Sequence, residues 1–124
     1  MPISPDLRPG DVWWAWLDPI RGREHGGRRP VLLVASAQFL DVIDTLALVV
    51  PVTSVDRQWP NHIRLSTLTT SSFAMTEQLR TISRERLHSR MGAATSDELA
   101  EVRLWLADFL DLPVPPHRYA ETPA

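Results

Sequence analysis

The sequence contains no cysteine and no lysine, and it has no long apolar run. Without cysteine there is neither a disulfide framework nor a thiolate metal site, and nothing indicates an oxidising compartment. No apolar segment approaches the roughly 20 residues that a membrane-spanning helix needs. The first residues also lack the charged and apolar regions of a signal peptide. We therefore expect a cytoplasmic protein without a membrane association.

The chain length of 124 residues and the hydrophobic content of 44% fit one domain with a single core. We expect a strand-rich part at about 10–93, a helix at about 96–110 and a flexible proline-rich tail at 113–124. The formal net charge is −2. However, residues 97–111 hold five acidic residues and one arginine, so the remainder is net positive and suits an anionic partner.

Short apolar segments bounded by Pro, Gly, Asp or Ser predict several strands followed by one helix. Residues 11–17 are apolar on both faces, which is typical of an inner strand. This spacing of turns predicts a compact antiparallel barrel. The further strands are expected at 31–35, 45–53, 61–65 and 75–82, with a possible short edge at 89–92 and a loop around 41–44.

A capping box from Thr95 to Glu98 predicts the start of the helix. The spacing of its apolar residues predicts one continuous stripe facing the core. Pro113 limits further extension. The stripe comprises Leu99, Val102, Leu106, Phe109 and Leu110.

Residues 22–34 join an arginine-rich and glycine-rich loop to an apolar strand. This arrangement holds positive charge at the edge of a rigid sheet, as a phosphate-binding site requires. Glycines let the backbone approach a ligand closely. The alternative is a basic turn in which Glu24 pairs with a neighbouring arginine. The arginines of this region are Arg21, Arg23, Arg28 and Arg29.

Several familiar chemistries have no support in the sequence. There is no phosphate-binding glycine motif of the GxGxxG or P-loop type and no HExxH zinc motif. The four histidines are widely scattered, so we expect neither a metal site nor a cofactor. Ser36, Ser54 and Ser83 lie near strand ends and fit turn residues better than nucleophiles.

Five segments in register resemble the MazF/PemK toxins of bacterial toxin-antitoxin modules, over residues 10 to about 110. The resemblance implies an SH3-like antiparallel barrel, a homodimer, and a metal-independent endoribonuclease that a cognate antitoxin blocks. The chain departs from the family at His25, where the family commonly has Gln. The segments are Gly10-Asp11-Val12, Asp18-Pro19, Gly22-x-Glu24-x-x-Gly27-x-Arg29-Pro30-Val31, Pro51-x-Thr53 and Glu77-Gln78-Leu79-Arg80-Thr81-Ile82.

The resemblance implies three catalytic candidates: Arg29, Thr53 and Glu24. The planar guanidinium fork of Arg29 suits two phosphate oxygens, and Thr53 matches the family's catalytic threonine. Glu24 either hydrogen-bonds to Arg29 or an RNA base, or takes part in proton transfer. Trp59 either stacks on a base or packs under its own loop or in an interface. The candidate RNA-binding residues are Arg21, Arg23, His25, Arg28, Trp59, Gln78 and Arg80.

The function implied by this resemblance is the toxin of a type II module that cuts single-stranded RNA and so inhibits translation and growth. Attack by the 2′-hydroxyl would leave 2′,3′-cyclic phosphate and 5′-hydroxyl ends. An antitoxin with an acidic C-terminal segment would compete with RNA for the arginines. Two alternatives remain open: a non-catalytic toxin that poisons gyrase by binding, and a degenerate module that binds RNA or antitoxin. The pair Arg29 and Thr53 favours catalysis.

Overall fold

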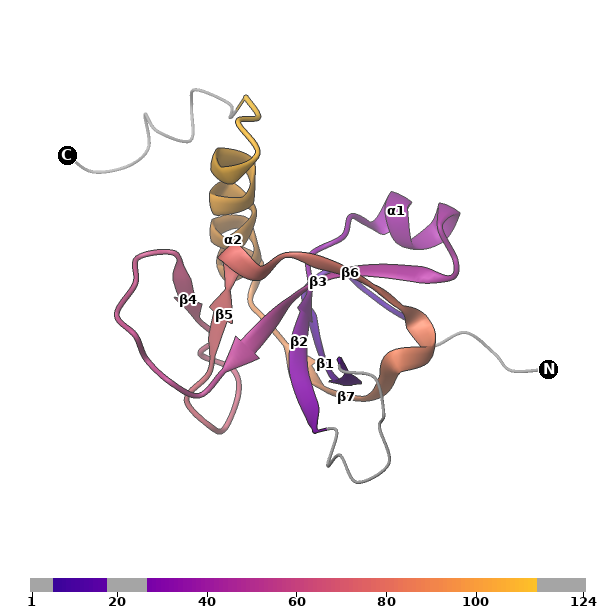
Figure 1. Cartoon of the computed structure of the whole chain (residues 1–124), viewed down its shortest axis with the longest axis horizontal. Coiled ribbons are helices and arrows are strands. Elements are labelled where there is room, and N and C mark those ends of the chain that lie inside the picture. Colours follow the sequence, from indigo (N-terminus) through magenta and orange to yellow (C-terminus); the bar gives the residue numbers. More distant parts are fainter. Residues whose placement is uncertain (1–5, 18–26, 114–124) are drawn as a thin grey trace.

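A computed structural model describes residues 6–17 and 27–113, which form seven antiparallel strands and two α-helices (Figure 1). The strands run β1 Asp11–Trp16, β2 Arg28–Leu33, β3 Leu46–Thr53, β4 His62–Arg64, β5 Phe73–Met75, β6 Arg80–Ser83 and β7 Leu87–Ala93. The helices are α1 Ala37–Val42 and α2 Ser96–Phe109, with short 3-10 turns η1 Thr76–Gln78 and η2 Arg84–Arg86. None of these helices is long and apolar enough to cross a membrane.

The sheet is organised around β3, its longest strand. The order of the path is β4-β5-β3-β2-β1-β7, and β6 also pairs with β3. One edge of β3 pairs with β2, while the other pairs with β6 near its start and with β5 near its end. Pro51 lies where the partner changes, which suits a residue that has no backbone N–H to donate. The described strands leave the sheet open, and the expected mainly-β, barrel-like fold with a C-terminal helix is confirmed.

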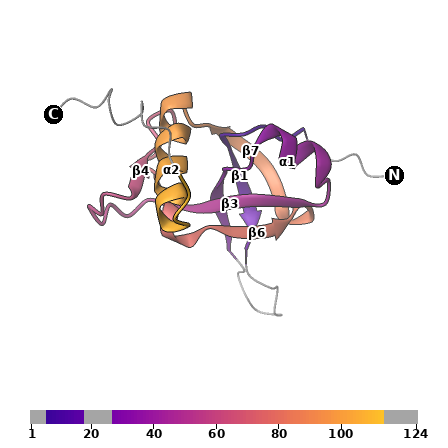
Figure 2. The same ribbon diagram turned by 90° about the horizontal axis from the view of Figure 1, so that it is seen from above.

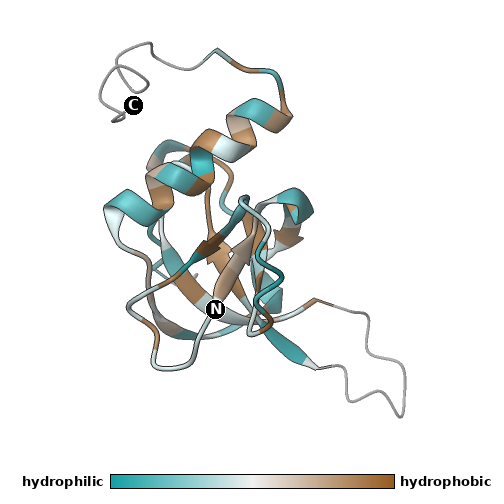
Figure 3. Ribbon diagram, turned by 90° about the vertical axis from the view of Figure 1, so that its left-hand side faces the viewer, coloured by the Kyte–Doolittle hydropathy of each residue, from teal (hydrophilic) through white to brown (hydrophobic). Residues whose placement is uncertain are grey.

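Alternating side chains of the central strands fill two cores on opposite faces of the sheet. Leu32 and Val50 belong to the core that packs against α2. Their neighbours Val31 and Val49 belong to the second core, which extends to α1. Helix α2 stands on the side of the molecule that carries β4 and β5, and α1 lies on the opposite side (Figures 1 and 2); Figure 3 shows the apolar residues gathered on the strands. The prediction that β1 is an inner strand is confirmed, because β1 pairs with β2 and β7.

Helix α2 begins as predicted, but its apolar stripe is shorter than expected. Thr95 and Glu98 form the capping box, with each side chain bonded to the backbone N–H of the other. Leu106 is buried, whereas Phe109 and Leu110 remain 46% and 56% exposed. The final turn projects beyond the sheet (Figure 1), so periodicity alone overestimated the buried face.

The predicted strand at 75–82 is wrong, because η1 interrupts it. Val52 pairs with Ala74, so an unbroken antiparallel strand would bring residue 77 opposite Val49. Instead, Arg80 lies opposite Val49. The three extra residues form η1, whose Thr76 is fixed by a hydrogen bond to the carbonyl oxygen of Asn61 at 2.8 Å. This contact connects residues far apart in the sequence, and local periodicity does not reveal it.

The predicted loop around 41–44 is partly helical. Ser36 caps α1 by accepting a hydrogen bond from the backbone N–H of Phe39 at 3.0 Å, and Leu40 buries its side chain in the core. At the other end, the guanidinium group of Arg84 donates to the carbonyl oxygens of Leu40 and Ile43. Six residues are too few to give a clear helical period.

Three other strands differ from expectation only in their bounds. Strand β2 spans Arg28–Leu33 instead of 31–35, so Arg28 and Arg29 lie on the strand and not in the loop before it. Strand β4 is shorter than predicted, at His62–Arg64. Strand β7 is longer than the predicted 89–92 and lies at the edge of the path. Its pairing with β1 contains two register irregularities. The expected tail lies outside the described residues from position 114 onward.

Matched leucine truncations on α2 test the corrected helix face. We expect Leu106→Ala to lower the free energy of unfolding by about 3 kcal/mol, because it leaves a cavity in the core. Leu110→Ala, in the same helix, should change it by less than about 0.5 kcal/mol. Urea unfolding followed by circular dichroism measures both. Equal losses would mean that the last turn is also covered.

Candidate active site

The pairing of β2 with β3 brings Arg29 and Thr53 to the same end of the two strands. The paired part of the two strands ends at Val31 opposite Pro51. Arg29 and Thr53 each lie two residues beyond this last pair, where Thr53 pairs with Phe73 of β5 and Arg29 with Ala15 of β1. Both residues line the same pocket, whose volume is about 430 Å³. Arg29 precedes the paired part of β2, and Thr53 follows the paired part of β3. Because the strands are antiparallel, both catalytic candidates lie at the same end of the pair.

The pocket lining combines apolar and polar side chains. It contains an indole, two prolines and two thioethers, together with hydroxyl groups and the guanidinium group of Arg29. A mixed lining of this kind can bind a ligand by apolar contact while a few polar groups orient it. The lining residues are Trp14, Arg29, Pro30, Pro51, Val52, Thr53, Ser54, Val55, Thr70, Ser72, Met75 and Met91.

Arg28 and Arg29 are neighbours on β2, but they have different surroundings. The guanidinium carbon of Arg28 lies 4.4 Å from the centroid of the Trp14 ring, in a cation–π contact against a wall of the pocket. The side chain of Arg29 makes no hydrogen bond or ion pair with any residue of 6–17 or 27–113. Its donors therefore have no competing acceptor in this part of the chain.

The hydroxyl group of Thr53 already has a defined hydrogen-bond role. Its Oγ1 accepts a hydrogen bond from the backbone N–H of Val55 at 3.1 Å. A hydroxyl group has one hydrogen to donate and two lone pairs. Because the backbone occupies a lone pair, the hydrogen stays available for an acceptor in the pocket. The strand end thus presents Thr53 as a donor.

Gln78 and Arg80 lie outside the pocket lining. The amide nitrogen of Gln78 contacts the Met75 sulfur at 3.6 Å, so Gln78 borders a residue that lines the pocket. Arg80 donates to the carbonyl oxygen of Leu17 at 3.3 Å. Its guanidinium group therefore supports the end of the β1 segment in addition to any contact with a ligand.

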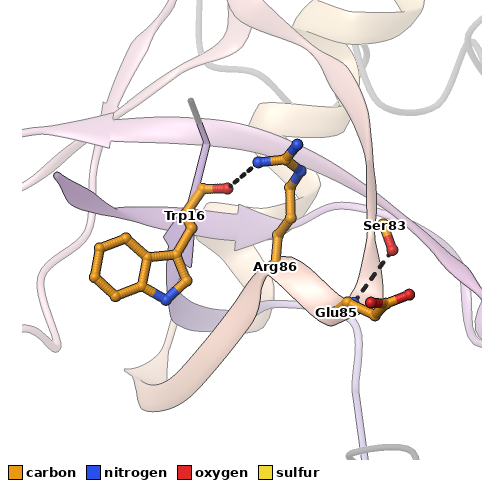
Figure 4. Close-up of a pocket in the computed structure, with 4 residues that line it drawn as sticks. All are labelled: Trp16, Ser83, Glu85 and Arg86. Atoms are coloured by element: carbon orange, nitrogen blue, oxygen red, sulfur yellow. Dashed lines mark hydrogen bonds between the residues drawn. The ribbon is translucent and has the colours of Figure 1, made fainter. Parts of the chain in front are cut away.

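A second arginine supports the same end of β1. Arg86 donates from Nη1 to the carbonyl oxygen of Trp16 at 2.9 Å, as Figure 4 shows. The nearby Ser83 side chain accepts from the backbone N–H of Glu85, which fixes the turn that carries Arg86. Together with Arg80, this arginine anchors the chain at the point where it leaves β1.

Four of the predicted site residues lie outside the described residues. These are Arg21, Arg23, Glu24 and His25, all within 18–26. Trp59 is described, but it does not line the pocket. It lies on the connection from β3 to β4 and is 47% exposed. Within the described ranges, no group of three or more His, Asp or Glu side chains could hold a metal ion.

A buried histidine and a carboxylate form a pair that sequence reasoning missed. His62 Nε2 lies 3.0 and 3.1 Å from the two carboxylate oxygens of Glu77. Burial raises the pKa of Glu77, but the hydrogen bonds and charge of His62, with a bond from Gln78, outweigh it and hold that pKa below its ordinary value. Fifteen residues separate the partners, and only the pairing of β4 with β5 brings them together.

Comparison with known proteins places the chain among relatives along most of its length. Residues 8–110 match the family model of "PemK-like, MazF-like toxin of type II toxin-antitoxin system". Endoribonuclease MazF9 of Mycobacterium tuberculosis is 36% identical over 115 residues, covering 86% of this chain and 98% of that protein. A MazF crystal structure from Deinococcus radiodurans is 32% identical, with a TM-score of 0.69, covering 90% of this chain and all of that one. A MazE-MazF structure from the same organism is 31% identical with a TM-score of 0.73 and the same coverages.

The lowered pKa of Glu77 predicts a loss of stability in acid. The folded state binds this proton less readily than the unfolded state, whose pKa is near the ordinary 4.5. The stabilisation of the folded state by the charged Glu77 carboxylate is therefore fully present above pH 4.5. It is lost as the pH falls through the lower pKa that Glu77 has in the folded state. Glu77→Gln removes this titration.

We expect wild type to be more stable than Glu77→Gln at pH 7 and the difference to shrink towards pH 3. Thermal unfolding of both proteins across this pH range measures it. A difference that stays constant with pH would contradict the assignment.

Proposed function

The chain belongs to the PemK-like, MazF-like toxin family of type II toxin-antitoxin systems, and we propose that it is an endoribonuclease toxin that cuts single-stranded RNA. The observation that carries this proposal is the placement of Arg29 and Thr53 in one pocket. The relative from M. tuberculosis, which the chain matches over most of its length, is named an endoribonuclease. Cleavage of cellular RNA would inhibit translation and growth.

The proposed reaction uses a nucleophile that the substrate supplies. The 2′-hydroxyl oxygen attacks the adjacent phosphorus and the bond from phosphorus to the 5′-oxygen breaks. The attacking hydroxyl loses its proton, and the leaving 5′-oxygen gains one. The products carry a 2′,3′-cyclic phosphate and a 5′-hydroxyl group. This route needs no metal ion, provided that the protein aligns the phosphate and stabilises its developing charge.

Arg29 and Thr53 supply that alignment and charge stabilisation. The guanidinium fork of Arg29 donates to two non-bridging phosphate oxygens. Thr53 donates its hydroxyl hydrogen to the same phosphate. The backbone N–H of Val55 occupies a lone pair of this hydroxyl oxygen and leaves its hydrogen available. Both side chains stand on paired strands, so the donors are preorganised and little reorganisation accompanies the reaction.

Proton transfer falls to the titratable groups of the segment that precedes β2. Glu24 either pairs with Arg29 or accepts the proton of the 2′-hydroxyl. His25 replaces the glutamine common in the family, which works without a titratable group there. We assign His25 a binding or tuning role. Both residues lie outside the described residues, and Arg21, Arg23 and Arg28 would add positive charge for the RNA backbone.

The proposed partners follow from family membership and from charge. A type II toxin is neutralised by a cognate antitoxin, and an acidic C-terminal segment would engage the same guanidinium groups as RNA. We also propose a homodimer. Val42, Ile43 and Leu46, at the end of α1 and the start of β3, remain 67%, 37% and 36% exposed, and burying exposed apolar surface favours self-association.

The nucleophile can be tested with a modified substrate. Mapping the 5′ ends of total RNA cut by purified protein gives the cleavage sequence, and an oligonucleotide is made from it. We expect cleavage in excess EDTA, with 2′,3′-cyclic phosphate and 5′-hydroxyl products. Deoxyribose on the 5′ side of the scissile bond should abolish cleavage and largely preserve binding. Efficient cleavage of the deoxy oligonucleotide, or a requirement for a divalent ion, would refute the mechanism.

The assignment of the catalytic pair can be tested by substitution. Arg29→Ala and Thr53→Ala should each lower the single-turnover rate by about 10²-fold or more, by analogy with the loss of one oxyanion-hole donor. Thr53→Ser keeps the hydroxyl group and should retain most activity. Arg64→Ala and Thr81→Ala, which change exposed residues outside the pocket, serve as matched controls. Wild-type rates in folded Arg29→Ala and Thr53→Ala would mean that the site lies elsewhere.

A further inference from the structure

His62 is a polar residue in a position that would suit an apolar one. Its side chain is only 1% exposed, and it lies on β4 opposite Met75, which lines the pocket. Nε2 carries the proton, because the carboxylate of Glu77 can only accept. The other ring nitrogen, Nδ1, is buried without a partner among the described residues. Burying an unpaired polar atom is unfavourable, so a phenylalanine would pack here at lower cost.

A network of hydrogen bonds fixes the orientation of the His62 ring. Asn61 donates from Nδ2 to Glu77 at 2.8 Å and to the Thr76 hydroxyl at 3.1 Å. Thr76 in turn donates to the Asn61 carbonyl oxygen. The carboxylate that holds His62 is therefore itself held, and the ring has little freedom to rotate.

The fixed ring supports one side of Trp59. The two ring centroids are 4.8 Å apart with the planes tilted by 47°, and the His62 backbone N–H donates to the Trp59 carbonyl oxygen at 3.1 Å. About half of the Trp59 surface stays open to solvent. The guanidinium carbon of Arg57 lies 5.9 Å from the same indole centroid. An exposed indole thus has a rigid ring and a cation beside it.

We propose that His62 is a positioning residue that holds Trp59 as a stacking surface for a nucleobase of the RNA next to the scissile phosphate. This inference rests on the proposed function. Trp59 follows Thr53 by six residues, a stretch that spans at most about 20 Å, so a neighbouring nucleotide is within reach. A cation beside an exposed aromatic ring suits a base and its phosphate together. Because the indole is held before binding, little conformational entropy is lost on binding.

The role of Trp59 can be measured with the uncleavable deoxy oligonucleotide. Trp59→Ala should raise its Kd about tenfold, in the range expected for the loss of one base stack. The single-turnover rate at saturating RNA should stay within about twofold. Binding should also quench tryptophan fluorescence in wild type and in Trp105→Phe, the control on α2, but much less in Trp59→Phe.

The role of His62 can be separated into its two contacts. His62→Gln keeps an amide donor for Glu77 and removes the ring, whereas His62→Phe keeps a ring against Trp59 and removes the donor. We expect a several-fold higher Kd for His62→Gln, partial recovery in His62→Phe, and unchanged saturating rates in both. Thermal unfolding confirms that each variant is folded, and the fluorescence comparison tests the stack without altering His62.

Unchanged RNA affinity and absence of wild-type cleavage would each overturn the inference. Unchanged RNA affinity in folded Trp59→Ala would show that no base stacks there. Loss of antitoxin binding with unchanged RNA affinity would make Trp59 a protein contact instead. If wild type cleaves RNA and Trp59→Ala binds RNA as tightly as wild type does, this inference fails and the proposed function stands. If wild type does not cleave RNA, the inference and the proposed function both fail.

Discussion

The antiparallel pairing of β2 with β3 is the constraint on which the candidate site depends. Val31 and Pro51 are fixed opposite each other, and the two strands are buried on both faces. A slip by one residue would exchange the side chains of β2 between the two cores, where they would no longer fit the close packing. Core packing therefore sets the register, and the register brings Arg29 and Thr53 to the same end of the strand pair, where both line one pocket. The stability of the sheet and the geometry of the proposed chemistry have the same physical origin.

The features that sequence could predict are those with a local cause. Residues 11–17 are apolar on both faces, and β1 is an inner strand. Thr95 and Glu98 have the spacing of a capping box, and they form one. Arg29 and Thr53 lie in matching motifs, and the sheet brings both to one pocket. Their catalytic roles stay predictions until the variants are measured.

The features that sequence missed have causes that lie far away in the chain. The turn η1 breaks the expected strand because Asn61 and His62 bind Thr76 and Glu77 across β4 and β5. Helix α1 depends on a guanidinium group from η2 as well as on its own cap. The exposure of Leu110 depends on where the sheet stops. No local pattern encodes these contacts, since each requires the fold to exist first.

Catalysis and recognition are carried by structurally different parts of the proposed site. Arg29 and Thr53 stand on paired strands, where small changes in position are resisted by a close-packed core. Trp59 stands on a connection between strands, which tolerates changes in length and sequence. The His62 and Glu77 pair joins the two parts, because it anchors that connection to a strand bordering the pocket. Substitutions in the connection can thus alter which base is bound while the phosphate donors keep their positions. Selection for a different RNA sequence would then act on the connection and leave the strand register unchanged.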